Sequence, residues 1–259
     1  MSVIYCKLNS GRALTLCTSV IVIVIIFYTR PIQQTEIISP VTQKAQKNIN
    51  PKELILKPLA STNRTILKRL PPGTQMGEKQ VAVITKALPR NGNLLVWGLG
   101  NDSPFWHDST QGKVIFIEPK GVWFKKIKNR FPYLEAYAVR YTTDTVKSFN
   151  KYINNSELWT ELDLRSELPP VVTQTPWDVI IVDAPPGYKK GTPGRYQSIY
   201  TSSLIAKNGT HIFVDDYERK VEREFSLKIL GNPREVISRQ AKTYAPANKQ
   251  AHFICIKEK

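Results

Sequence analysis

The chain has 259 residues, 41% of them hydrophobic, which is enough for one domain of ordinary size with appendages. Two of its three cysteines, Cys6 and Cys17, lie near the amino terminus, so Cys255 can form neither an intradomain disulfide nor a thiolate zinc site. Thirty-seven lysines and arginines against 21 acidic residues give a formal net charge of +16. This charge indicates an anionic partner or an anionic surface.

The amino-terminal segment predicts a membrane anchor. Residues 13–28 form an uninterrupted run without a charge, with Lys7 and Arg12 before it and Arg30 after it. As a helix the run would cover ~24 Å, close to the ~30 Å hydrocarbon core of a bilayer. A cleaved signal peptide is the alternative, but the end of the run offers no small-x-small cleavage site. The flanking charges therefore predict a type II protein with a cytoplasmic tail over residues 1–12 and a signal anchor over residues 13–29.

Residues 30–75 predict a lumenal stem, and residues 76–259 the domain. The stem is polar, rich in proline and without a sustained apolar period, so it cannot build a packed core. In a lumenal setting the sequon at Asn63 is the first candidate for N-glycosylation. A lumenal protein does not meet nucleic acid, so the positive charge predicts an acidic polysaccharide or a membrane surface as partner.

From Glu78 onward, apolar runs alternate with helical patterns, which is typical of an α/β sheet with helices on both faces. The predicted strands are Leu94–Trp97, Val114–Ile117, Leu134–Val139, Trp177–Val182, Thr210–Val214, Glu235–Arg239 and His252–Ile256. The predicted helices are Glu78–Leu88, Gly121–Asn129, Asp144–Tyr152, Tyr196–Lys207 and Val221–Leu230. Seven strands, with a loop and no full helix before the last, favour a Rossmann-like class I methyltransferase sheet over a six-stranded dinucleotide-binding fold.

The first two predicted strands frame a candidate site for a nucleoside-containing cofactor. Gly98 and Gly100 form a Gly-x-Gly turn where ligand and backbone approach closely, and Asn101 and Asp102 belong to the same loop. Glu118 ends the second strand, where a carboxylate can accept hydrogen bonds from the hydroxyls of a ribose. The pattern fits a dinucleotide-binding oxidoreductase as well as a methyltransferase.

Further carboxylates end later strands, namely Asp183 and the pair Asp215 and Asp216. Ligands of an open α/β sheet bind outside the carboxyl ends of its strands, so these acids are expected to converge on one crevice. Asp183 could accept a substrate proton, or hold a divalent metal with Asp215 or Asp216. The alternatives are a helix cap or an ion pair for Asp183, and opposite faces for the adjacent Asp215 and Asp216.

A loop rich in glycine and proline follows Asp183. Tyr188, Lys189 and Arg195, with the neighbouring Tyr196, are candidates to bind an acceptor, because an aromatic ring suits a sugar and a guanidinium binds a uronate through a bidentate fork. The alternative is a structural crossover whose Arg195 pairs with Asp183 or Asp216.

Four blocks carry a resemblance to a known family. VWGLGNDSPFW, WDVIIVDAPPGY, GTPGR and HIFVDDYERKVEREF resemble, in order and spacing, the glucuronoxylan 4-O-methyltransferase family of polysaccharide biosynthesis proteins. The resemblance implies transfer of a methyl group from S-adenosyl-L-methionine to O4 of a glucuronic acid side chain, with a divalent metal as a candidate second cofactor. It also implies a protein of the Golgi membrane, since plant members are Golgi type II proteins.

On the matching positions, Gly98, Gly100 and Glu118 would bind the methyl donor. Asp183 and Tyr188 would flank the reacting centre, and Arg195 would lie near the acidic sugar. The chain departs from the family pattern in having Asn101 in place of histidine and Pro186 in place of arginine. Because the family also includes arabinogalactan-directed enzymes, the resemblance leaves the acceptor polymer open.

Two other functions stay open from the sequence. A nicotinamide-dependent sugar oxidoreductase would call for a third glycine in the first turn, where this chain has Ser103, and for a Tyr-x-x-x-Lys pair. A non-catalytic scaffold of a glycan-synthesising complex would keep the fold without the chemistry.

Overall fold

The structure, a computed structural model, describes residues 4–5, 71, 74–144, 147–239 and 247–257. The predicted anchor and nearly all of the predicted stem, with its sequon at Asn63, lie outside these residues. Among the residues that are described, no helix has the length and apolar character needed to cross a membrane.

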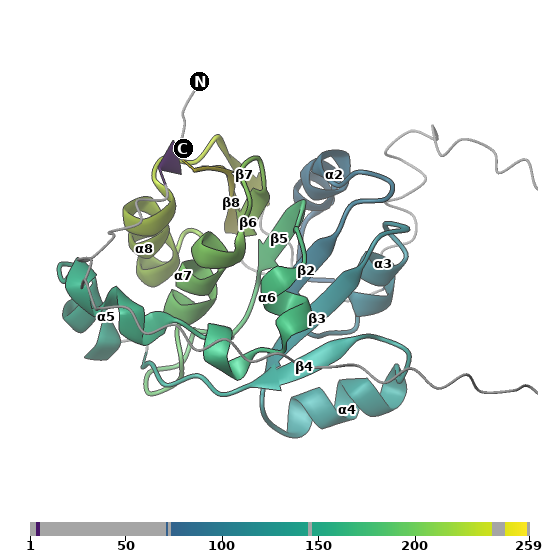
Figure 1. Cartoon of the computed structure of the whole chain (residues 1–259), viewed down its shortest axis with the longest axis horizontal. Helices are drawn as coiled ribbons and strands as arrows, with labels where there is room; N and C mark the ends of the chain where they lie inside the picture. The colour runs from purple at the N-terminus through teal and green to yellow at the C-terminus, as the bar shows by residue number, and fades with distance from the viewer. Residues whose placement is uncertain (1–3, 6–70, 72–73, 145–146, 240–246, 258–259) are drawn as a thin grey trace, which may run out of the picture. The chain divides into compact units, whose positions relative to one another are not determined.

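The domain is built on one mixed sheet (Figure 1). Five neighbouring strands run parallel in the order β4-β3-β2-β5-β6, and β8 then pairs antiparallel with β6, and β7 antiparallel with β8. This arrangement confirms the predicted seven-stranded, mostly parallel Rossmann-like sheet. Their bounds are β2 Leu94–Trp97, β3 Val114–Pro119, β4 Ala136–Val139, β5 Val179–Val182, β6 His211–Val214, β7 Glu235–Arg239 and β8 Asn248–Ile256.

An eighth, two-residue strand joins the sheet from the amino terminus. β1, Ile4–Tyr5, pairs parallel with Cys255 and Ile256 of β8. These two residues belong to the segment predicted to be a cytoplasmic tail.

Helices cover both faces of the sheet because its central strands are apolar on both sides. Every residue of β2 and β5 is buried, as expected for parallel strands between two helical layers. Leu94 and Val96 pack with α2, α3 and α4, whereas Leu95 and Trp97 pack with α5, α6, α7 and α8. These helices are α2 Glu78–Ala87, α3 Ser103–His107, α4 Val122–Arg130, α5 Lys147–Tyr152, α6 Pro170–Gln174, α7 Tyr196–Ile205 and α8 Lys220–Leu230.

The segment between α5 and β5 departs most from the prediction. It forms two 3-10 turns, Ser156–Leu162 and Arg165–Glu167, and the short helix α6. None of the three has a sustained helical period in the sequence. Their buried Leu162 and Val172 join the core on the α7 side of the sheet, so packing determines their conformation.

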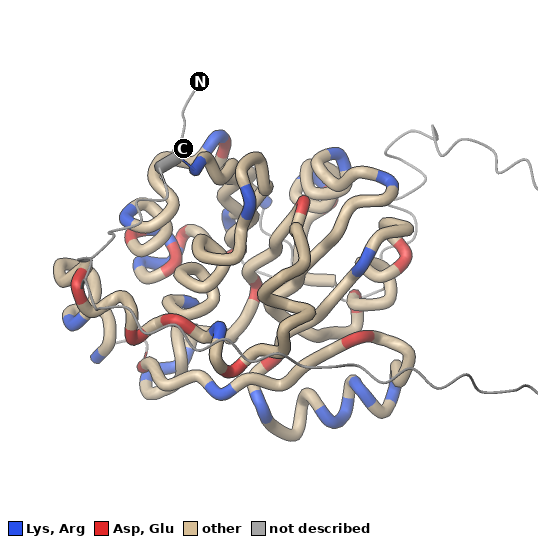
Figure 2. Tube along the Cα trace, viewed as in Figure 1, with Lys and Arg blue, Asp and Glu red and all other residues tan. Residues whose placement is uncertain are grey.

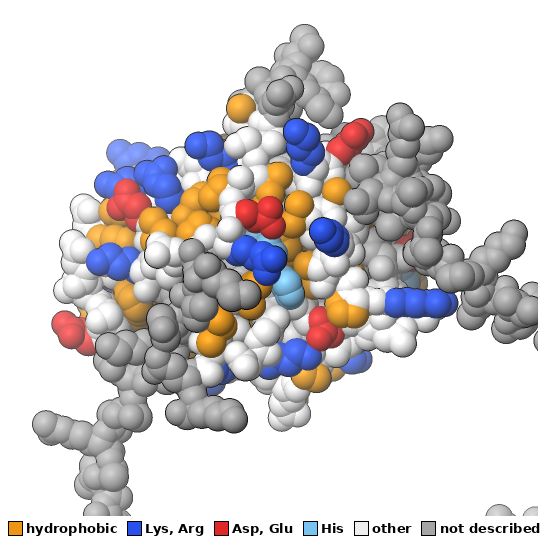
Figure 3. Space-filling view, turned by 90° about the horizontal axis from the view of Figure 1, so that it is seen from above, with side chains coloured by type: hydrophobic (Ala, Val, Ile, Leu, Met, Phe, Trp, Pro, Cys, Tyr) orange, Lys and Arg blue, Asp and Glu red, His pale blue; other side chains and the backbone are white. Residues whose placement is uncertain are grey.

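Basic side chains are spread over the domain surface. Figure 2 shows lysine and arginine positions along α4 and on α8, and Figure 3 shows them distributed over one whole face. Within α4, Lys125, Lys126, Lys128 and Arg130 face no acidic residue of the same helix. Residues 71–259 have 27 lysines and arginines against 19 acidic residues, so about half of the net charge of the chain belongs to the domain.

Candidate active site

A cavity opens where the strand order reverses. The chain passes from β2 outward to β3 and β4 and then returns to β5 on the other side of β2, which makes the carboxyl ends of β2 and β5 the topological switch point. A cavity of about 620 Å³ lies there. Its lining includes Gly98, Gly100, Glu118, Trp123, Asp183 and Tyr188.

The glycine turn after β2 requires its glycines. Gly98 has φ +132°, a conformation that strains any residue with a Cβ. A Cβ on Gly100 would lie 2.9 Å from Asp102 Oδ1, and the Gly100 N–H donates to Ser103 Oγ at 2.9 Å. The turn therefore brings bare backbone to the cavity, which is what a close-fitting ligand needs.

Glu118 reaches the same turn from β3. Its side chain is 7% exposed, and its Oε2 accepts the Leu99 N–H at 2.8 Å. Desolvation by burial raises the pKa of Glu118 to about 8; the Leu99 N–H opposes this shift and the Asp183 charge adds to it. A carboxylate in this place can accept ribose hydroxyls, as the sequence predicts.

Trp123 was not among the predicted site residues. It lies in the first turn of α4, lines the cavity, and donates its indole N–H to Leu99 O at 2.7 Å. The backbone N–H of Leu99 is thus bonded to Glu118, and the backbone carbonyl of Leu99 is bonded to Trp123. The tryptophan follows Glu118 closely in the sequence, but no spacing rule connects an aromatic residue at that position to a cofactor.

Asn101 and Asp102 also line the cavity. Asn101 is exposed, and its Oδ1 accepts from Arg130 at 2.9 Å. Asp102 Oδ2 accepts the indole N–H of Trp106 at 3.1 Å, and desolvation by burial raises the pKa of Asp102. Both side chains thus brace the loop between β2 and α3 from the two flanking helices.

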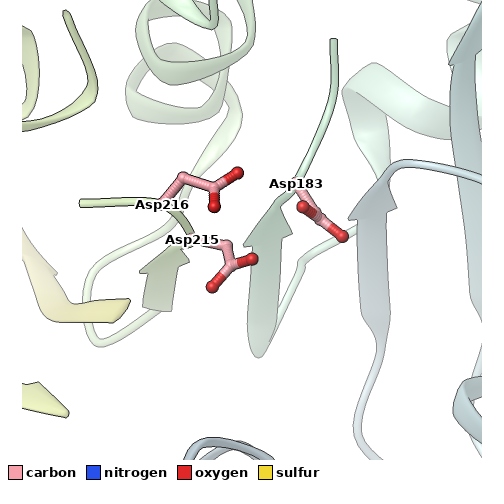
Figure 4. Close-up of side chains that lie close together, drawn as sticks. All are labelled: Asp183, Asp215 and Asp216. Carbon is pink, nitrogen blue, oxygen red and sulfur yellow. The ribbon is translucent and has the colours of Figure 1, made fainter. Parts of the chain in front are cut away.

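The three aspartates predicted at strand ends meet. Asp183 follows β5 and Asp215 and Asp216 follow β6, and one carboxylate oxygen from each lies within 4.8 Å of the others (Figure 4). The alternative prediction, that Asp215 and Asp216 point to opposite faces, is wrong. Asp216 has φ +56°, so the chain turns sharply after β6 and brings its carboxylate back toward Asp183.

Arg195 lies among these carboxylates and is only 2% exposed. Its Nη2 pairs with Asp183 Oδ1 at 3.0 Å and with Asp216 Oδ2 at 2.7 Å. Its Nε donates to Pro185 O at 3.1 Å and its Nη1 to Asp215 O at 2.6 Å. This is the structural alternative predicted from the sequence, with both aspartates paired at once.

The buried guanidinium bears directly on the predicted metal site. A divalent cation held by Asp183, Asp215 and Asp216 would lie beside a fixed positive charge that already bonds two of the three carboxylates. Such a donor set does not fit a metal ion, so no step of the chemistry below passes through one.

Asp183 has the environment of a general base. Its side chain is 38% exposed and lines the cavity, so a substrate can reach it. Desolvation raises the pKa of Asp183 to about 7; Arg195 opposes the shift, and the charges of Asp216 and Asp102 add to it. A carboxylate that titrates near neutral pH can take a proton and release it again.

The acceptor-binding candidates separate into buried and exposed residues. Tyr196 is fully buried, with its ring 4.9 Å from that of Phe225, so burial removes it from the residues that can contact an acceptor. Arg195 is buried as well, so the predicted contact between Arg195 and the acidic sugar is wrong for the same reason. Tyr188 is 66% exposed at the cavity mouth, and Lys189 lies beside it with Nζ 5.6 Å from the ring centroid.

The chain resembles plant proteins of polysaccharide biosynthesis. Residues 78–241 match the family model described as IRX15/IRX15L/GXM. Glucuronoxylan 4-O-methyltransferase 2 of Arabidopsis thaliana is 31% identical over 85% of this chain and 84% of that protein. Glucuronoxylan 4-O-methyltransferase 1 is 36% identical over 59% and 60%, and Arabinogalactan O-methyltransferase 1 is 33% identical over 57% of each, both from the same plant.

Solved structures show weaker similarity. N-methyltransferase NodS from Bradyrhizobium japonicum WM9 in complex with S-adenosyl-L-homocysteine is 14% identical, with a TM-score of 0.45 over 68% of this chain and 84% of that one.

Proposed function

Because the chain belongs to the IRX15/IRX15L/GXM family, we propose that it is an S-adenosylmethionine-dependent O-methyltransferase that acts on the uronate residues of an acidic polysaccharide. The relatives that are named for an activity are O-methyltransferases of glucuronoxylan or arabinogalactan. The acceptor we propose is therefore the 4-hydroxyl of glucuronic acid in a polymer of this kind.

One observation carries the proposal. Glu118 and Asp183 line the same cavity at the switch point of the sheet, next to the turn at Gly98, whose backbone conformation favours glycine. A donor whose nucleoside end is bound by Glu118 and the glycine turn would place its other end toward Asp183. The bare backbone of the turn, the buried carboxyl group and the aromatic side chain that line the cavity thus fit a methyl donor that contains a nucleoside.

The chemistry follows from the position of Asp183. When bound, S-adenosylmethionine supplies an electrophilic methyl group on a positively charged sulfur. Asp183 takes the proton from the sugar hydroxyl while that oxygen bonds to the methyl carbon and the carbon–sulfur bond breaks. Arg195 holds the Asp183 carboxylate in place, and alignment of the two substrates in one cavity lowers the barrier further.

Incubation of the full chain, solubilised in detergent, with labelled methyl donor and a panel of uronate-bearing glycans tests this proposal. We expect label at the uronate residues and micromolar donor binding by calorimetry. Gly100→Asp is the control, because a side chain there collides with Asp102 and should abolish binding of the donor.

The alternatives predict different outcomes of the same measurements. Donor binding without transfer to any uronate would reject the acceptor class. Binding of NAD in place of S-adenosylmethionine would indicate the oxidoreductase, and binding of neither would indicate a scaffold.

We also propose that residues 13–29 anchor the protein in the Golgi membrane with the domain in the lumen. The support is the uninterrupted run without a charge and its flanking basic residues. Protease treatment of sealed Golgi vesicles should leave the domain intact, and digestion of the domain without detergent would contradict this orientation.

A further inference from the structure

An exposed aromatic ring stands at the mouth of the active-site cavity. Tyr188 is 66% exposed and is the most exposed aromatic side chain among the described residues. It lines the cavity together with Asp183. An aromatic side chain in this place offers an apolar face and a polar tip to a ligand that enters the cavity.

The backbone that carries Tyr188 is fixed on both sides. Pro185 O accepts from Arg195 Nε at 3.1 Å, and Pro186 O accepts from Arg219 Nη1 at 2.5 Å. After Tyr188, Lys189 O accepts both the N–H and the Oγ1 hydroxyl of Thr192, at 3.2 and 2.6 Å. These bonds hold the backbone of the loop, which reduces the backbone entropy lost when a ligand packs on the ring.

Gly187 adds a further constraint to this loop. It has φ +68°, and a Cβ there would lie 3.0 Å from the buried Glu222 Oε1. Glycine adopts this backbone conformation without strain, so Gly187 lets the loop pass close to α8 just before Tyr188.

The charge beside the ring is positive. Lys189 Nζ lies 5.6 Å from the centroid of the Tyr188 ring. Lys189 and Lys190 are both exposed on this loop, whereas the nearby Arg195 is buried and already paired. The ammonium lies over one face of the ring, and the pair matches a uronate sugar, whose C–H face packs on an aromatic surface while its carboxylate pairs with a cation.

We propose that Tyr188 and Lys189 form the acceptor platform of this enzyme. The ring packs under the uronate residue that receives the methyl group, and the Lys189 ammonium pairs with its carboxylate, so that the sugar hydroxyl reaches Asp183. This inference rests on the proposed function and deepens it. It also assigns Tyr188 a different role from the predicted one at the reacting centre, because the ring acts and the hydroxyl does not.

Three variants of Tyr188 and a distant control separate ring from hydroxyl. With the full chain in detergent, Tyr188→Phe should keep kcat and change the acceptor KM by less than about twofold. Tyr188→Ala should raise the acceptor KM roughly tenfold, and Tyr188→Trp should restore it. Tyr133→Ala is the matched control, because Tyr133 is 58% exposed but does not line this cavity.

The charge is tested on Lys189 with two acceptors. One is a uronate-bearing oligosaccharide and the other is its methyl ester, which keeps the ring and loses the charge. The wild-type protein should prefer the free uronate; Lys189→Gln should remove this preference by raising only the KM of the free uronate, and Lys189→Arg should restore it.

Two results would overturn the platform. A loss of kcat in Tyr188→Phe as large as in Tyr188→Ala would assign the chemistry to the hydroxyl. A higher dissociation constant for the methyl donor in Tyr188→Ala, with an unchanged acceptor KM, would show that the ring contacts the donor and not the acceptor.

Failure of the platform is distinguishable from failure of the proposed function. If the wild-type protein transfers no methyl group, calorimetric titration with the same oligosaccharides still measures whether Tyr188→Ala and Lys189→Gln weaken their binding. Equal binding by wild type and both variants would reject the platform.

Discussion

At Glu118, a buried carboxyl group links donor binding to pH. Desolvation raises its pKa to about 8, so near neutral pH the empty site holds mainly the protonated form, whereas the ionised form accepts ribose hydroxyls. We expect the donor dissociation constant to fall as pH rises toward about 8, by at most about tenfold per pH unit, and then to level off. Calorimetry in buffers of different ionisation enthalpy measures both this slope and the proton released.

The isosteric variant Glu118→Gln is the control for this prediction. It should bind the methyl donor more weakly than the wild type, and its dissociation constant should no longer change with pH near pH 8. Since the pKa in the folded state lies above its ordinary value of 4.5, Glu118 lowers the stability of the empty protein progressively between about pH 4.5 and 8. Glu118→Gln should therefore unfold at higher urea than wild type at pH 8 and not at pH 4.5, and a wild-type affinity that is flat with pH would refute the linkage.

At Arg195, a buried cation holds the carboxylate cluster together. Its removal leaves Asp183, Asp215 and Asp216 close together without the guanidinium that neutralises them. We expect Arg195→Met to lower the free energy of unfolding by about 3–5 kcal/mol at pH 7, measured by urea denaturation. The loss should grow as pH rises above 7, because Arg195 lowers the pKa of Asp183 and the variant without it must ionise this carboxyl at a higher pH.

Arg165→Met is the matched control, because Arg165 pairs with Asp163 through a side chain that is 50% exposed. That substitution should cost less than about 1 kcal/mol. Equal losses in the two variants would show that Arg195 does not stabilise the cluster through its charge.

The same residues show how far the sequence predicts the site. The convergence of Glu118, Asp183 and the Asp215–Asp216 pair follows from the rule that parallel strands end at one edge. The turn at Asp216 does not follow, because strand alternation cannot anticipate a residue with φ +56°. The burial of Arg195 also depends on tertiary packing, since a guanidinium in a glycine-rich loop can face either the solvent or the core.

Among the elements, β1 is a strand of only two residues. Ile4 and Tyr5 pair with the last residues of β8, which already has β6 and β7 as partners. An anchored molecule would hold its cytoplasmic tail across the membrane from β8, so it cannot form this pair. We therefore expect two shortened proteins to behave alike: one that consists of residues 71–259, and one that lacks only residues 13–29. Their free energies of unfolding should agree within about 1 kcal/mol, and their affinities for the methyl donor should be the same.

Urea denaturation and calorimetry of these two proteins, both of which lack the uncharged run, make the comparison. A loss of more than about 3 kcal/mol in residues 71–259 would show that β1 is an integral strand. It would also argue against the proposed anchored topology.

Elements were predictable where burial dictates a simple pattern. β2 appears at its predicted bounds, because four consecutive apolar residues between turn signals fit a strand buried on both faces. β8 begins at Asn248, well before the predicted His252, because its polar first residues are strand only through pairing with β7. Such tertiary pairing, like the packing that shapes residues 156–174, leaves no periodic signal in the sequence.

At the scale of the whole molecule, the positive charge of the domain should act on the acceptor and much less on the donor. Basic residues are spread over the surface, including α4 and the Tyr188 loop, so a polyanionic glycan meets a positive potential at long range. Salt shortens the screening length from roughly 10 Å at 0.1 M to 3 Å at 1 M. We expect the acceptor KM to rise severalfold between about 0.05 and 0.5 M NaCl, whereas the donor, enclosed in the cavity, keeps its dissociation constant within about twofold.

The methyl-esterified acceptor separates this long-range effect from the chemistry. Without charge it feels no steering, so its KM should stay nearly constant over the same salt range while kcat for both acceptors is unchanged. Steady-state kinetics at four salt concentrations make the comparison. An acceptor KM that is independent of salt would mean that the positive surface serves another anionic partner, such as the membrane, and that recognition of the glycan is confined to the short-range contacts at the cavity mouth.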